Sequence, residues 1–173
     1  MDLLHHGVAL VGPYLQTYGL FALLALIALE SVGLPLPGET ALIACVALAY
    51  EGTFPIVAVF TIAASAAVLG DGIGYCVGRF GGRILLERFG GRIGLTPQRQ
   101  KWVEDLYARH GAIVVVAARF VPVLRQLNGP VAGTLAMPWP IFFVANCAGA
   151  VLWAGAWSFA PYVFVHLAQH LIG

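Results

Sequence analysis

The sequence predicts an all-α integral membrane protein, and two observations support this fold class. The 173-residue chain is 60% hydrophobic and 10% charged, with a mean hydropathy of +0.87, whereas about a quarter of the residues in soluble domains are charged. Asp, Glu, Lys and Arg are also absent from three long stretches, Leu3–Leu29, Gly52–Gly70 and Gln126–Gly173. Because a helix needs about 20 apolar residues to cross the hydrocarbon core, these stretches provide room for roughly three or four crossings.

One membrane domain, residues 1–173, accounts for the length and leaves no room for a separate soluble catalytic module. The three cysteines lie in apolar stretches without CxxC or Cys–His spacing, so we expect buried, inert thiols. The sequence therefore predicts neither a metal site nor a cofactor.

Positive charge is concentrated in one segment, about residues 79–110, which holds seven of the nine Lys and Arg residues. Cytoplasmic connections of membrane proteins carry such an excess, so we place this segment in the cytoplasm, lying on the membrane. Most of it is expected to be a solvated helical linker. Nucleic-acid binding is not expected, because the basic stripe is short and adjoins lipid-embedded sequence.

The first apolar region, about residues 18–50, is predicted to form a broken helical hairpin. Four residues that disfavour a continuous helix interrupt it: Gly33, Pro35, Pro37 and Gly38. Each flanking arm has about a dozen residues, too few to span a bilayer at 1.5 Å per residue. A re-entrant hairpin fits better than two crossings, and its tip must then face protein or a water-filled cavity.

A second region of the same character covers about residues 111–137. Pro122, Gly129 and Pro130 are predicted to break it near its middle. Each hairpin is followed by an aromatic-Pro-Ile sequence that opens a long apolar span, at about residues 54–78 and about 139–165. With the basic segment in the cytoplasm, the two hairpins would enter from opposite faces, as in an inverted-topology repeat whose tips meet near the midplane.

Five ionisable residues fall inside apolar sequence, where a charge costs at least about 2.5–3.5 kcal/mol. They are Glu30, Glu39, Asp71, Arg119 and Arg125. If the two tips meet, both glutamates approach both arginines, and opposite charges attract strongly in a low dielectric. The alternatives are snorkelling side chains near an interface, or ion pairs with a purely structural role.

These residues belong to a longer pattern. Its parts are Glu30-x2-Gly33-x-Pro35-x-Pro37-Gly38-Glu39, Gly70-Asp71-x2-Gly74-Tyr75-x2-Gly78-Arg79, Arg119-Phe120-x-Pro122-x2-Arg125-x6-Ala132-Gly133-x3-Met137, and then Asn146, Gly149 and Trp153. Over about residues 20–160 the sequence resembles the DedA family of bacterial inner-membrane proteins, whose eukaryotic relatives are VTT-domain lipid scramblases. The resemblance implies a multi-pass inner-membrane protein that moves lipid across the bilayer, notably recycling undecaprenyl phosphate, in several members with dependence on the proton-motive force. It maps the family's embedded acid pair onto Glu30 and Glu39, and its paired arginines onto Arg119 and Arg125.

The chemistry of these side chains agrees with that role. Arginine binds phosphate oxygens through parallel donors and keeps its charge, so we expect Arg119 and Arg125 to bind substrate, with Gln126 and Asn128 lining the second tip. Carboxylates add a titratable group, because burial and a neighbouring guanidinium shift a carboxylate's pKa in opposite directions.

Proton coupling is therefore assigned to the embedded acids. These are Glu30, Glu39 and Asp71, although capping or a hydrogen bond to the second hairpin explains Asp71 equally well. Gly33, Pro35, Pro37, Gly38, Pro122, Gly129, Pro130 and Gly133 are assigned a structural role. Asn146 is expected to make a helix-packing hydrogen bond, and Trp139, Trp153 and Trp157 are expected in interfacial belts.

The sequence thus predicts a proton-coupled transporter or flippase for a lipid phosphate, whose partners are membrane lipid and protons. A passive phospholipid scramblase, a membrane lipid phosphatase and a structural membrane-assembly factor are the alternatives. The phosphatase is disfavoured, because a His nucleophile with an acidic partner is needed. None of the five histidines adjoins Arg119, Arg125 or an embedded acid in the sequence.

Overall fold

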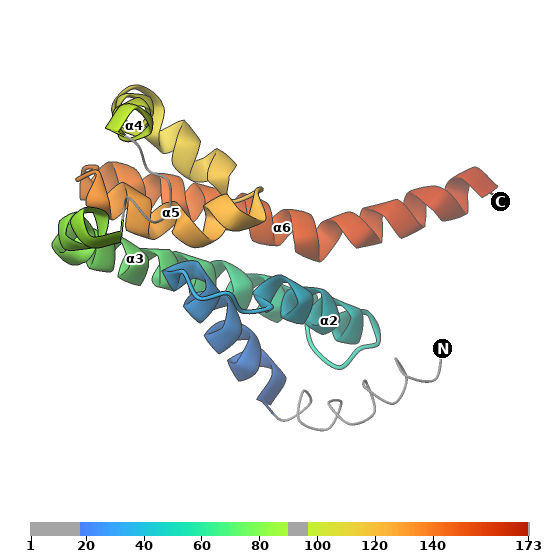
Figure 1. Cartoon of the computed structure of the whole chain (residues 1–173). Coiled ribbons are helices and arrows are strands. Elements are labelled where there is room, and N and C mark those ends of the chain that lie inside the picture. The colour runs from blue at the N-terminus through green and yellow to red at the C-terminus, as the bar shows by residue number, and fades with distance from the viewer. Residues whose placement is uncertain (1–17, 90–96, 173) are drawn as a thin grey trace.

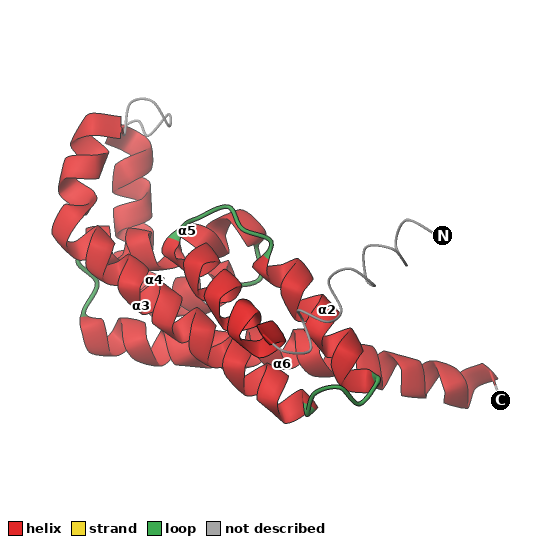
Figure 2. Cartoon of the chain, turned by 90° about the horizontal axis from the view of Figure 1, so that it is seen from below, coloured by secondary structure: helices red, strands yellow, loops and turns green. Residues whose placement is uncertain are grey.

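The computed structural model describes residues 18–89 and 97–172, and this part of the chain consists of helices joined by short connections (Figures 1 and 2). The described helices are Tyr18–Val32, α2 (Gly38–Tyr50), α3 (Ile56–Phe89), α4 (Pro97–Ala118), α5 (Pro122–Thr134) and α6 (Trp139–Ile172). The predicted all-α fold is confirmed.

The first hairpin is broken where the sequence predicts. Its first helix ends at Val32, Gly33 adopts a φ of 117° that glycine tolerates best, and α2 begins at Gly38 after Pro37. The 13 residues of α2 extend about 20 Å at 1.5 Å per residue, which is less than the roughly 30 Å hydrocarbon core. Re-entry into a bilayer stays a prediction.

The second hairpin is broken at one of its two predicted places. α4 ends at Ala118 and α5 begins at Pro122, a first-turn position that proline favours. The predicted break at Gly129 and Pro130 is wrong, because α5 continues through both residues to Thr134. Pro130 removes a single hydrogen bond from the helix, and close packing against α3 holds the helix together there.

Two long helices, α3 and α6, have 34 residues each. Both contain a stretch long and apolar enough to cross a membrane, Ile56–Gly82 and Trp139–Ala160. α3 continues beyond the predicted span into the basic segment. The later part of that segment forms the start of α4, which kinks at His110 (φ −135°, ψ 22°).

Part of the basic segment lies outside the described residues. This applies to residues 90–96 and, among the basic residues of the flanking helices, to the side chains of Arg83, Arg88 and Arg99. The first 17 residues of the chain also lie outside the described part.

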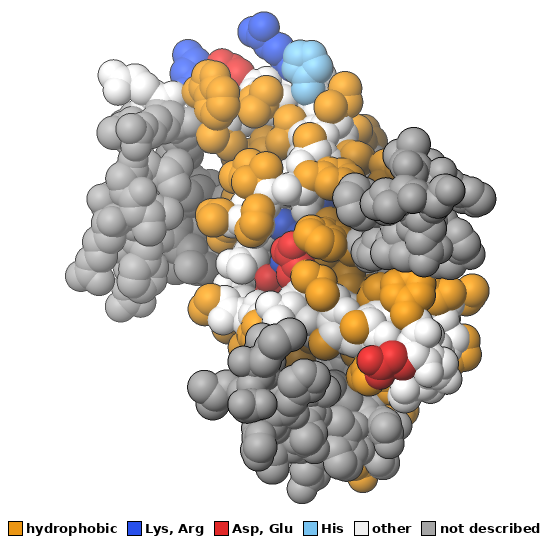
Figure 3. All heavy atoms as spheres, turned by 90° about the vertical axis from the view of Figure 1, so that its right-hand side faces the viewer, with side chains coloured by type: hydrophobic (Ala, Val, Ile, Leu, Met, Phe, Trp, Pro, Cys, Tyr) orange, Lys and Arg blue, Asp and Glu red, His pale blue; other side chains and the backbone are white. Residues whose placement is uncertain are grey.

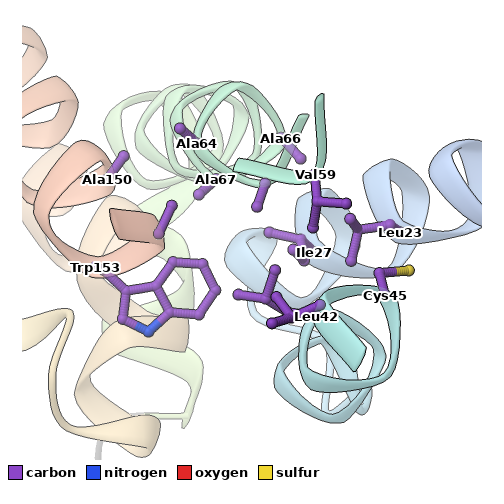
Figure 4. Close-up of a cluster of buried hydrophobic side chains, with 13 residues drawn as sticks. Leu23, Ile27, Leu42, Cys45, Val59, Ala64, Ala66, Ala67, Ala150 and Trp153 are labelled. Carbon is purple, nitrogen blue, oxygen red and sulfur yellow. The ribbon is translucent and has the colours of Figure 1, made fainter. Parts of the chain in front are cut away.

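Two apolar clusters form the interior. The first joins the first hairpin to α3 and α6, with Leu23, Leu42, Val59 and Trp153 among its members (Figure 4). The second, which includes Tyr75 and Phe142, joins α3 to α4, α5 and α6. Along α3 the segment between the two clusters carries Gly70 and Asp71, and along α6 it carries Asn146 and Gly149. The polar residues therefore lie between two apolar layers.

The outer surface is apolar as well. Large hydrophobic side chains are exposed on several helices, among them Phe21, Val57, Ile73, Ile113 and Val144. Figure 3 shows a mainly hydrophobic face, with acidic and basic atoms reaching the surface near its middle. An apolar surface of this extent indicates contact with lipid rather than with water.

Candidate functional site

Arg125, in the first turns of α5, binds both glutamates of the first hairpin. Its Nη2 donates to Glu30 Oε1 at 2.7 Å and lies 3.4 Å from Glu39 Oε2. The guanidinium carbon also lies 4.6 Å from the centre of the Trp153 ring on α6, which is within cation–π range. Arg125 and Glu30 are buried, whereas the Glu39 side chain is 30% exposed.

The break between the two arms of the first hairpin places both acids. Glu30 lies in the last turn of the first arm and Glu39 in the first turn of α2. A Cβ at Gly38 would lie 2.3 Å from Glu30 Oε2, so only glycine allows this approach without rearrangement. The tip also meets the second hairpin, because a Cβ at Gly33 would lie 3.6 Å from the backbone oxygen of Gln126.

Arg119, just after α4, occupies a second ion-pair site. Its Nη2 lies 2.5 Å from Asp71 Oδ2 and donates to Asn146 Oδ1 and, at 3.3 Å, to the backbone oxygen of Ala67. Asn146 Nδ2 in turn donates to the Val68 carbonyl at 3.2 Å. Arg119 is 1% exposed and Asp71 is 0% exposed, so this pair ties the second hairpin to α3 and α6 out of contact with solvent.

Several buried polar atoms at this second site have no hydrogen-bond partner among the described residues. Arg119 Nε and Nη1, Asp71 Oδ1 and Asn128 Oδ1 are buried and have no hydrogen-bond partner within the described part of the chain. Unpaired buried donors and acceptors cost about 1–3 kcal/mol each. Such groups point to a ligand, a proton or water, each of which would satisfy them.

A cavity of about 300 Å³ adjoins both sites. Glu39, Arg119, Pro122, Trp153 and Trp157 contribute to its walls. The cavity therefore has an arginine of the second hairpin and a carboxylate of the first hairpin in one largely apolar wall. The rings of Trp153 and Trp157 on α6 contribute to the same wall.

Small residues hold α3 and α5 together beneath the arginines. A Cβ at Gly78 would lie 2.0 Å from the Pro130 oxygen, and one at Gly133 would lie 2.0 Å from the Tyr75 oxygen. A Cβ at Gly129 would lie 2.3 Å from the backbone oxygen of Asp71. The two backbones therefore touch directly, as small residues permit between membrane helices, and this contact fixes Asp71 relative to α5.

The structure brings the predicted residues together in a specific arrangement. Both glutamates share Arg125, whereas Arg119 pairs with Asp71 and contacts neither glutamate through any ion pair of the described residues. Asn128 is buried and donates to the Val115 carbonyl at 3.0 Å. The sequence therefore located the five charges, and its alternative of a hydrogen bond between Asp71 and the second hairpin is confirmed by the contact with Arg119. It did not predict that the two arginines pair with different acids.

Trp153 lies in different surroundings from those predicted, and Asn146 has a contact beyond the one predicted. Trp153 is 2% exposed and packs against Arg125, so its placement in an interfacial belt is wrong. Asn146 makes the expected helix-packing hydrogen bond to α3 and in addition accepts from Arg119. The spacing of Asn146 and Trp153, seven residues on one α6 face, was the sequence signal for this role.

The fold and this site define a class: an α-helical integral membrane protein with ion pairs buried between two broken hairpins. A VTT domain model matches residues 36–163, and the chain therefore belongs to the VTT domain (DedA) family of membrane proteins.

Three curated relatives illustrate the match. Protein DedA of Escherichia coli is 30% identical over 172 residues, which cover 95% of this chain and 78% of the relative. An uncharacterized membrane protein of Mycobacterium tuberculosis is 37% identical, over 84% of this chain and 69% of the relative. An uncharacterized membrane protein of Synechocystis is 39% identical, over 80% and 64% respectively. No solved structure matches the chain significantly.

Proposed function

We propose that the protein transports a lipid phosphate across the bacterial inner membrane, with undecaprenyl phosphate as the substrate, and couples this transport to protons. The observation that carries the proposal is that one arginine, Arg125, is shared by two carboxylates next to a cavity inside an apolar bundle. Embedded ionisable groups of this kind mark substrate and ion pathways in membrane proteins.

The charges at Arg125 do not balance. Two ionised carboxylates and one guanidinium carry a net charge of −1, and the Glu30–Arg125 pair alone would be neutral. A proton on the second carboxylate restores neutrality in a low dielectric, which favours binding of one proton by the pair. The proton is assigned to the Glu30–Glu39 pair as a whole, because both carboxylates share the one guanidinium of Arg125.

The phosphate group of the lipid would compete with the carboxylates for the two arginines. A phosphate group in the cavity next to Arg119 and Glu39 would interact with the donors of Arg119 that have no protein partner and would attract Arg125 away from Glu39. The Glu30–Glu39 pair would then take up a proton, since part of its compensating charge has moved. Departure of the phosphate reverses both steps, and proton and substrate are thereby coupled.

The arrangement of hairpins supports access from both faces. We propose that the two hairpins are re-entrant, enter from opposite sides and form an inverted repeat around this site. In each half a helix, a break and a 13-residue helix precede a long apolar helix, and in the second half the first helix is α4, which kinks at His110. Broken helices that meet near the midplane are a recurrent way of building a transport site.

We also propose that the protein carries out no covalent chemistry on the lipid. His110, the histidine whose surroundings are described, lines a different cavity from Arg119. A phosphatase would need a nucleophile and an acid within hydrogen-bonding reach of the phosphate ligands.

Reconstitution in liposomes tests the proposed function. A fluorescent undecaprenyl phosphate is added to the outer leaflet, and the fraction protected from dithionite reports its movement inward. Arg125→Lys keeps the charge but loses the planar donor set, so we expect transport to fall at least about tenfold, equivalent to one charge-assisted hydrogen bond.

Arg79→Lys is the matched control, because Arg79 is exposed on α3 away from the cavity. It should transport at the wild-type rate. Wild-type transport by a correctly folded Arg125→Lys variant would rule out Arg125 as a phosphate ligand. Release of inorganic phosphate from the lipid would instead favour the phosphatase.

A further inference from the structure

An apolar groove runs along the outside of the molecule between α4 and α6, apart from the cavity that adjoins Arg119. It has a volume of about 660 Å³. One wall is a face of α4 that includes Ile113 and Ala117, and the other is a face of α6 that includes Ile141, Val144 and Ala148. These residues are exposed to the surroundings of the protein. The groove is thus open to lipid along its length.

One end of this groove is polar. A second cavity, of about 470 Å³, shares Ala112, Ile113 and Ile141 with the groove and is therefore continuous with it. Glu104, Arg109 and other residues around the α4 kink line this polar mouth. The apolar groove and the charged residues at its mouth together match the polarity of a lipid, which has a long hydrocarbon part and a polar or charged end.

We propose that this groove binds one anionic membrane lipid, with its hydrocarbon chain between α4 and α6 and its headgroup at Arg109 and His110. The occupant is indicated by charge: Arg109 and His110 are exposed at the mouth beside Glu104, and the surrounding segment, residues 79–110, holds seven Lys and Arg residues against three acidic ones. Anionic lipid headgroups are attracted to such basic groups at the membrane surface.

The mouth also offers an uncharged hydroxyl. Burial, with a further contribution from Asp71, raises the pKa of Tyr107 to about 12. Tyr107, which lines the mouth, stays protonated throughout the physiological range, as a tyrosine with its ordinary pKa of about 10 also does. A neutral hydroxyl can donate to a phosphate oxygen without adding negative charge.

The groove and the ion-pair site lie on two sides of the same stretch of α6. Ala145 lines the groove, while the next residue, Asn146, accepts a hydrogen bond from Arg119. A Cβ at Gly149 would lie 2.8 Å from Arg119 Cδ and 3.3 Å from the Cα of Val116 in the groove wall. The wall of the groove therefore adjoins the Arg119 site around Val116 and Gly149.

The inference rests on the proposed function in one respect, which is that the bound lipid is taken to be one that the protein carries. Binding is measured separately from transport, on the full chain in detergent, by native mass spectrometry with added dioleoylphosphatidylglycerol. We expect one tightly bound lipid per chain, weaker binding of phosphatidylcholine, and no displacement by inorganic phosphate, which lacks the hydrocarbon chain.

Ala117→Phe and Ala148→Phe fill the groove from its two walls without altering buried residues. Both should reduce lipid binding at least about tenfold. Ala25→Phe is the control, because Ala25 is an exposed alanine on the first hairpin, outside the groove, and it should bind like the wild type. Arg109→Gln should remove the preference for phosphatidylglycerol over phosphatidylcholine.

Unchanged lipid binding in both groove-filling variants would overturn the inference. So would a change in oligomer size without a change in bound lipid, since a protein would then be the occupant. Lost binding together with lost transport supports the groove as part of the path, whereas lost binding with wild-type transport contradicts that link. If Arg125→Lys transports normally while the groove still binds lipid, the proposed function fails and the groove site stands.

Discussion

Gly38 controls the position of the carboxylate that contacts Arg125 most closely. A Cβ at this residue would lie 2.3 Å from Glu30 Oε2 and 3.2 Å from the Cα of Ile27. The side chain of Glu30 therefore occupies the space that any larger residue would need. Since Glu30 is buried, the carboxylate has little freedom to move elsewhere. Gly38 therefore both begins α2 after the break and leaves the space that the Glu30 carboxylate occupies.

Gly38→Ala should accordingly displace Glu30 and weaken its pair with Arg125. Breaking a buried ion pair costs about 3–5 kcal/mol when one partner is removed, and displacement should cost a substantial part of that. We expect a lower melting temperature and a loss of transport. Gly155→Ala is the control, because its Cβ would lie 3.7 Å from Phe60, an ordinary contact. Equal melting temperatures for the two variants would contradict the assigned role of Gly38.

The pairing of the charges could not be predicted at the residue scale. Glu30, Glu39, Arg119 and Arg125 were identified from their apolar surroundings, but both arginines were expected to face both glutamates. The structure separates them, because Asp71 reaches Arg119 from the face of α3 that also carries Ala67. Which acid pairs with which arginine depends on the rotation and depth of α3 relative to the hairpins, and no spacing of residues in the sequence reveals these.

At the scale of elements, the contact between α3 and α5 holds the second hairpin against the rest of the described chain. These helices contact each other more extensively than any other pair in the described chain. Gly74 and Gly78, four residues apart on α3, both face Pro130 on α5. Backbone contact of this kind leaves no space for a methyl group. This seam, the glycine-lined contact between α3 and α5, consequently fixes the second hairpin and its arginines relative to α3.

Gly78→Ala should push α5 away from α3 and reduce both stability and transport. A Cβ there would lie 2.0 Å from the backbone oxygen of Pro130, and backbone cannot move aside cheaply. Overpacking of this type costs about 1–3 kcal/mol. Gly72→Ala on the same helix is the control, since its Cβ meets only Trp139 at 3.8 Å. The seam would not be structurally important if thermal unfolding of the two variants coincided.

The elements themselves were largely predictable. Apolar runs and their proline and glycine interruptions indicated the first hairpin, the break before Pro122 and both long helices. The expected break at Pro130 failed for a physical reason: a proline costs a helix one hydrogen bond and a clash, and the seam with α3 compensates for this. Tertiary packing overrode the local preference, and packing against another helix is not visible in the sequence of α5.

At the scale of the whole molecule, the topology determines whether the site is reached from both faces. The basic residues of α4 are expected in the cytoplasm, and the turn between α2 and α3, residues 51–55, is expected on the opposite face. Because α3 contains an apolar stretch of 27 residues, Ile56–Gly82, it is long enough to separate these regions.

Cysteine labelling checks this topology. Single cysteines are placed at residues 51–53 and at residues 101–109, in a background without the native cysteines, and treated with an impermeant maleimide in right-side-out vesicles. The first group should react and the second should react only after permeabilisation. Labelling of both groups from one side would contradict the proposed inverted repeat.

The central claim is that the carboxylates at Arg125 exchange a proton as the lipid phosphate binds and leaves. Its most direct measurement is the pH dependence of undecaprenyl phosphate transport in liposomes, with and without a pH gradient, for the wild type, Glu30→Gln and Glu39→Gln. Glutamine mimics the protonated acid but cannot titrate. Both substitutions should abolish the pH dependence, with some downhill lipid movement retained.

Arg79→Lys should keep the wild-type pH profile, because Arg79 is exposed and does not line the cavity. If both glutamine variants also kept that profile, the Arg125 site would not couple protons to transport. The protein would then take its proton at Asp71 or act as a passive scramblase.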